Sequence, residues 1–100
     1  MSATDTTARR LGPASPEDAA DLAAFARALQ RFEPLAAVRL QAHGDVVAAW
    51  ARPPFGVLVM IAARLREPLV LDATVHVAAL ASAAGDDPMS VIDLPPDVPA

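Results

Sequence analysis

The sequence predicts an α+β fold: an antiparallel sheet, a four-strand meander plus a final strand, covered on one face by a long N-terminal helix and a short second helix. Hydrophobic residues recur with helical spacing up to residue 33, and from residue 37 onward they alternate with polar residues as in half-buried strands. Helices on one face of an antiparallel sheet are an ordinary two-layer solution. The chain has 100 residues, 54% of them hydrophobic, which is enough for one core.

The helix predicted over residues 15–33 has a clear start, an apolar stripe and a clear end. Ser15 can cap it, and Pro16 suits the first helical position. The stripe residues are spaced three or four apart: Leu22, Phe25, Leu29 and Phe32. Pro34 ends the helix, because proline cannot continue the hydrogen-bond pattern. We expect Phe25 and Leu29 to be buried against the sheet.

Four strands and a short helix are predicted after this proline. The strands cover residues 37–43, 46–52, 57–64 and 69–77, with turns at 44–45, 52–56 and 66–68. The third strand is apolar on both faces, as expected for a strand in the middle of a sheet. Residues 77–84 predict a short helix that Gly85 stops, and residues 89–94 predict the final strand.

The predicted domain spans residues 15–94. Residues 1–14 lack hydrophobic periodicity and predict a flexible arm, and the Pro-rich residues 95–100 predict a tail or the start of a linker. The first residues are polar and acidic, unlike a signal peptide, and the longest apolar stretch, residues 57–63, is too short to span a bilayer. We therefore expect a cytoplasmic protein with no membrane partner.

Three stretches of the chain carry a resemblance to a known family. Residues 25–29 look like a first helix, residues 35–49 like a first hairpin, and residues 67–80 like a Pro-containing turn, strand and second helix. Over residues 25–94 the chain resembles one repeat of the bacterial DNA sliding clamp, the polymerase III beta subunit. The resemblance implies a clamp-repeat-like fold, a bacterial origin, subunits that pair through sheet edges, and an accessory role in DNA replication or repair.

The charge of the chain disfavours DNA as a partner. Eight basic residues, all arginine, stand against twelve acidic residues, which gives a formal net charge of −4. Proteins that bind nucleic acid usually carry a basic stripe that neutralises phosphates. DNA binding is therefore an alternative and not the leading prediction.

His43, Asp72 and His76 are the polar candidate site. Alternation places Asp72 and His76 on one sheet face, and if His43 shares that face, the three side chains can bind zinc or a small molecule, or transfer protons. The alternative, which we favour, is the solvated outer face of a sheet. The chain has no cysteine and no HExxH, GxSxG or Gly-rich phosphate motif. We predict no catalytic residue, metal or cofactor, and no enzyme.

Trp50, Arg52 and Phe55, around the double proline at 53–54, are interaction candidates, together with Val91 in the final strand. Trp and Arg are enriched in interface hot spots, and a stiff Pro-Pro segment presents its neighbours at low entropic cost. The alternative, which we favour for Trp50 and leave open for Phe55, is that these two residues close one end of the core. The leading prediction is a non-catalytic protein–protein interaction module that forms a homo-oligomer by edge pairing, with another protein as an alternative partner.

Overall fold

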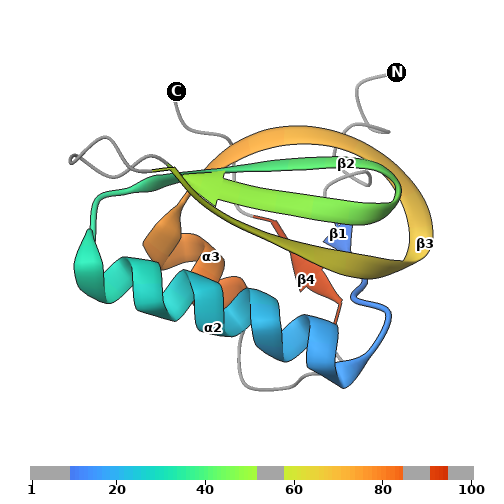
Figure 1. Ribbon diagram of the computed structural model, residues 1–100, viewed down its shortest axis with the longest axis horizontal. Coiled ribbons are helices and arrows are strands. Elements are labelled where there is room, and N and C mark those ends of the chain that lie inside the picture. Colours follow the sequence, from blue (N-terminus) through green and yellow to red (C-terminus); the bar gives the residue numbers. More distant parts are fainter. Residues whose placement is uncertain (1–9, 52–57, 85–90, 95–100) are drawn as a thin grey trace.

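Figure 1 shows the helices packed on one side of a bent ribbon of long strands. The computed structural model describes residues 10–51, 58–84 and 91–94. The elements in chain order are β1 (Arg10–Leu11), α2 (Pro16–Phe32), β2 (Ala37–Ala51), β3 (Val59–His76), α3 (Val77–Ala84) and β4 (Ile92–Asp93). The described chain is therefore α+β, with two helices and one dominant pair of strands.

Helix α2 begins where the sequence predicts, because Ser15 caps it. The Ser15 hydroxyl accepts a hydrogen bond from the Asp18 N–H at 3.1 Å, and Pro16 takes the first helical position. The core-facing side is buried at Ala19, Leu22, Ala23, Ala26 and Leu29, whereas Phe25 is only half-buried. The helix has 17 residues and a length of about 26 Å, so it is shorter than the long helix predicted over residues 15–33.

The predicted four-strand meander is wrong. Strands β2 and β3 are each continuous and form one antiparallel pair: residues 37–44 pair with 69–76, and residues 46–51 pair with 59–64. The first predicted strand thus lies beside the fourth. In Figure 1, β2 turns back near its middle and β3 follows around the outside of the bend. The error arose because alternation fixes the face of each side chain but not the neighbour of each strand.

A bulge at Gly44 lies at this bend. Gly44 has a φ of 89°, in the left-handed region that favours glycine, and the register shifts between Gly44 and Val46. Asp45 is therefore left without a partner residue, and the strand bends. The chain reverses direction at the turn predicted at 44–45, but this reversal lies inside the single element β2.

The short strands β1 and β4 form a second, two-stranded sheet. Strand β4 covers only two residues of the predicted 89–94, of which 89–90 lie outside the described part, and it pairs with β1 through Leu11 and Ile92. Residues 12–14 then run along β3: the Arg66 N–H donates to the Gly12 carbonyl at 2.7 Å, and the Ala14 N–H donates to the Arg64 carbonyl at 2.9 Å. Gly12 and Ala14 are thus hydrogen-bonded to β3, whereas residues 10–11 are paired with β4.

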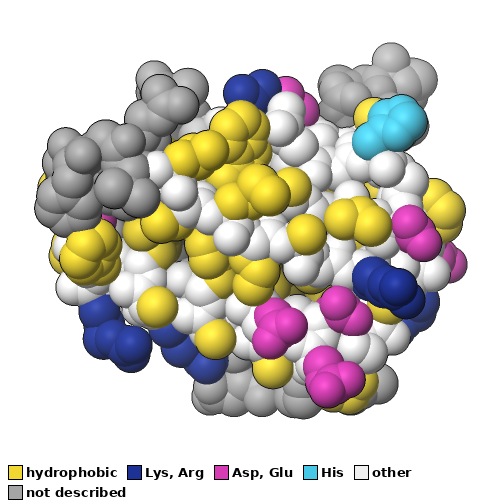
Figure 2. All heavy atoms as spheres, viewed as in Figure 1, with side chains coloured by type: hydrophobic (Ala, Val, Ile, Leu, Met, Phe, Trp, Pro, Cys, Tyr) yellow, Lys and Arg dark blue, Asp and Glu magenta, His cyan; other side chains and the backbone are white. Residues whose placement is uncertain are grey.

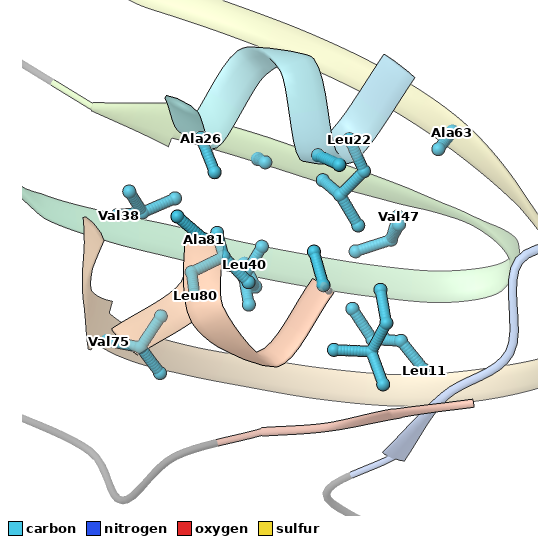
Figure 3. Close-up of a cluster of buried hydrophobic side chains, with 14 of the residues drawn as sticks. Leu11, Leu22, Ala26, Val38, Leu40, Val47, Ala63, Val75, Leu80 and Ala81 are labelled. Carbon is cyan, nitrogen blue, oxygen red and sulfur yellow. The ribbon is translucent and has the colours of Figure 1, made fainter. Parts of the chain in front are cut away.

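The core lies between the ribbon and the two helices. In Figure 3, side chains from α2 (Leu22), α3 (Leu80) and the strands (Leu40, Val47) point toward one another. The largest fully buried side chains are Leu11, Leu22, Leu40, Leu80, Val38, Val47, Val75 and Val77. In β3 the buried residues are odd-numbered, so its even-numbered side chains lie on the opposite face, here called the outer face.

Candidate interaction surface

The outer face of the ribbon carries a contiguous apolar surface. Directly paired residues share a face, and on this face Trp50 pairs with Met60 and Ala48 pairs with Ala62. Val46 lies next to them and is 42% exposed, whereas Met60 is 63% exposed. We call these five residues the apolar surface. Figure 2 shows hydrophobic side chains gathered over the part of the view where β2 and β3 lie.

Trp50 lies at one end of the apolar surface, next to an ion pair. The Arg39 guanidinium donates two hydrogen bonds to the Asp72 carboxylate, at 3.0 and 2.9 Å. These bonds lower the pKa of Asp72 and raise the pKa of Arg39. The Arg39 guanidinium carbon also lies 5.6 Å from the centre of the Trp50 ring, within range of a cation–π contact. The Arg39–Asp72 ion pair therefore borders this end of the apolar surface.

The indole nitrogen of Trp50 has an unusual position. Within the described part of the chain, Trp50 Nε1 is buried and has no hydrogen-bond partner. Trp50 as a whole is half-buried and lies on the outer face, outside the main core cluster. Trp50 therefore lies away from the core, and the prediction that it closes one end of the core is wrong.

The polar candidates His43, Asp72 and His76 share the outer face but do not converge. His43 pairs with Val70, Asp72 with Gln41, and His76 with Ala37. Asp72 and His76 are four residues apart on one strand, about 13 Å at the usual rise. No cluster of three or more metal-ligating side chains lies within the described residues. The Asp72 carboxylate is bound by the Arg39 guanidinium in a salt bridge. This arrangement is that of a solvated sheet face.

The other interaction candidates lie away from Trp50 or outside the described residues. Arg52 and Phe55 lie outside them. Val91 directly precedes β4, is 46% exposed, and borders a groove of about 380 Å³ that is also lined by Arg10 and Arg66. The structure therefore places Trp50 and Val91 beside different surfaces.

Sequence reasoning missed the free edge of β3. Within the part of the chain that the structure describes, residues 59–63 pair with β2 on one side only, although their apolar character on both faces predicted a central strand. Beside them lies an apolar groove of about 300 Å³ between α2 and β3, lined by Phe25, Ala28, Leu29, Phe32 and Val59. The signal that could have revealed this edge is the absence of charge from 57 to 63, since an apolar run also fits an edge that another chain covers.

The fold and surface define a small α+β domain with an open, apolar sheet edge. The chain belongs to the family described as "Domain of unknown function (DUF8010)", whose family model matches residues 6–99. No curated protein and no solved structure matches the chain, so the resemblance to a clamp repeat stays a prediction. No helix within the described residues has both the length and the apolar content needed to cross a membrane.

Proposed function

We propose that this domain is a non-catalytic protein–protein interaction module that associates with a second copy of itself. One observation carries the proposal: the apolar surface lies on the face of the ribbon opposite the helices, and its two β3 residues fall within the uncharged residues 59–63. Exposed apolar groups that are contiguous, and not scattered, mark surfaces that other proteins cover. A second copy seated beside Met60 removes part of this area from water.

The chemistry of the described surface fits binding better than catalysis. The bordering polar groups are engaged with each other, because Asp72 is held by both guanidinium hydrogen bonds of Arg39. A half-buried tryptophan with an arginine above it is a composition typical of interface hot spots. These groups can anchor a protein partner without moving a proton.

The test is the mass of the full chain in solution. Sedimentation equilibrium across a dilution series is expected to show a monomer–dimer transition, and Met60→Lys is expected to shift it toward monomer because the lysine charge would have to be desolvated in the interface. Val70→Lys is the matched control, since Val70 is 76% exposed on the other half of β3. It should leave the transition unchanged.

Circular dichroism at each concentration verifies that the variants keep the fold. A wild-type chain that stays monomeric at every concentration would overturn the proposal. Equal dissociation by the Met60 and Val70 variants would assign association to general surface hydrophobicity and would also overturn it.

A further inference from the structure

The edge of β3 that faces away from β2 is closed at one place. The Arg64 N–H donates to the Asp18 carboxylate at 3.0 Å, and the Arg64 carbonyl accepts from the Ala14 N–H. The Arg66 N–H donates to the Gly12 carbonyl. Since N–H and C=O groups alternate in direction along an antiparallel strand, these bonds show that the even-numbered residues of β3 direct their backbone groups away from β2.

The same edge is open at Met60 and Ala62. Both residues are even-numbered and exposed, and no described hydrogen bond beyond the β2–β3 ladder reaches them. Two N–H and two C=O groups therefore face outward. Natural edge strands usually carry charges or proline that block pairing with another chain, but residues 59–63 carry neither. This half of the edge is chemically suited to accept another strand.

The core-facing side of this edge is also incompletely covered. Val59 and Ile61 are only partly buried, whereas Ala51 and Ala49, to which they are paired, are buried. The apolar groove between α2 and Val59 lies next to them. A strand added at the edge would place its own core-facing side chains over this groove and would complete the burial.

We propose that two copies of the chain pair edge to edge about a twofold axis, with β3 antiparallel to β3 of the partner and Met60 opposite Ala62 of the partner subunit. This inference rests on the self-association proposed above and specifies its geometry. Each Met60 and Ala62 then exchanges both backbone hydrogen bonds with the partner strand, and the two ribbons join into one sheet. A twofold axis requires the same segment from both chains, which an uncharged segment permits without like-charge contacts.

The charges of α2 favour a second copy as the occupant over a different protein. The Asp18–Arg64 bond places the start of α2 beside Arg64, and the groove places its end beside Val59, so the helix runs along the first half of β3. A twofold axis through this half sets the two α2 helices antiparallel. The exposed acids of the early turns, Glu17 and Asp21, then face Arg31 in the last turn of the partner helix. The surface is therefore complementary to itself.

Proline substitution tests the pairing, because it removes one outward N–H and leaves the β2 ladder intact. Ala62→Pro is expected to abolish the dimer at concentrations at which the wild type is dimeric. Val70→Pro is the matched control, since Val70 is also an even-numbered exposed residue of β3, and it should dimerise as the wild type does. Circular dichroism checks that both variants are folded.

Amide hydrogen exchange of the wild-type chain gives an independent measurement. The amides of Met60 and Ala62 should be protected in concentrated samples and should exchange freely in dilute ones, whereas the Val70 amide should exchange freely in both. A wild-type dimer in which these two amides stay unprotected, or which Ala62→Pro leaves intact, would overturn the edge pairing and leave the proposed self-association standing. A wild type that never dimerises would overturn both.

Discussion

Two leucines of the same helix are expected to differ in their contribution to stability. Leu22 is 1% exposed and lies in the centre of the core, whereas Leu29 is 5% exposed and lines the apolar groove beside Val59. Leucine to alanine removes three carbon groups, and at about 0.8 kcal/mol each the transfer contribution is about 2.4 kcal/mol at both sites. The helix propensity changes equally, so any difference reflects the surroundings of each side chain.

The surroundings add a cavity cost at Leu22 but little at Leu29. A closed cavity costs about 24 cal/mol per Å³, which raises the total for Leu22→Ala to about 3–5 kcal/mol. At Leu29 the vacated space joins a groove that is already open, so Leu29→Ala is expected to cost only about 2–3 kcal/mol. The predicted order is therefore Leu22→Ala more destabilising than Leu29→Ala.

Urea unfolding followed by circular dichroism measures both costs. All variants must be compared at one protein concentration, because association would stabilise the folded state by mass action. Leu35→Ala is the control; its side chain is 82% exposed, and a change within about 0.5 kcal/mol is expected. Equal costs at Leu22 and Leu29, with unchanged denaturant slopes, would refute the argument that the groove relieves the cavity at Leu29.

Three further predictions follow from local geometry. A hydrogen bond from the Arg64 N–H and a second one from the Ser15 hydroxyl lower the pKa of Asp18 below its ordinary value of 3.8. The stability that ionised Asp18 contributes is therefore present above pH 3.8 and is lost as the pH falls through the lowered pKa. Thermal melts below about pH 4 should show a smaller loss of stability for Asp18→Asn than for the wild type. Asp72→Asn should release Arg39 from the Trp50 ring and change the tryptophan fluorescence, with little change in stability because both charged partners are about half exposed; an unchanged spectrum would contradict the contact. Gly44→Ala should cost about 1–2 kcal/mol in urea unfolding, and Gly44→Asn less, because the strain lies in the backbone and no atom lies within 4 Å of an added Cβ; equal costs would argue against a φ effect.

The helix was predictable because its determinants are local. Ser15, Pro16 and the spacing of Leu22 and Leu29 lie within one segment and act on that segment alone. The boundary at Phe32 likewise follows from the proline two residues later. Such signals specify a helix whatever surrounds it, and the structure confirms them.

The sheet was not predictable in the same way, because pairing depends on segments far apart in the chain. The alternation in 37–43 and 69–77 correctly gives two half-buried strands, and it is satisfied equally by a meander and by the observed pairing of 37–44 with 69–76. In the observed pairing β3 continues past the bend of β2 at Gly44, so both of its ends pair with β2. No periodicity within one segment contains that information.

The candidate site shows the same limit. Period two correctly placed Asp72 and His76 on one face, but the distance between them and the engagement of Asp72 by Arg39 depend on register. Trp50 was identified by residue type alone. The contact that holds Arg39 over its ring joins the two halves of β2 across the bend at residues 44–45.

The misassigned strand at 57–64 links the fold to the proposed function. A strand that is apolar on both faces is expected to be surrounded by its own chain, because isolated apolar edges associate. Among the described residues, 59–63 have a neighbouring strand on one side only, and Val59 and Ile61 are incompletely covered. The two statements agree if the missing neighbour is another chain. Under edge pairing through Met60 and Ala62, residues 59–63 become an interior strand of a continuous sheet, so the inference that was wrong for the single chain holds for the pair.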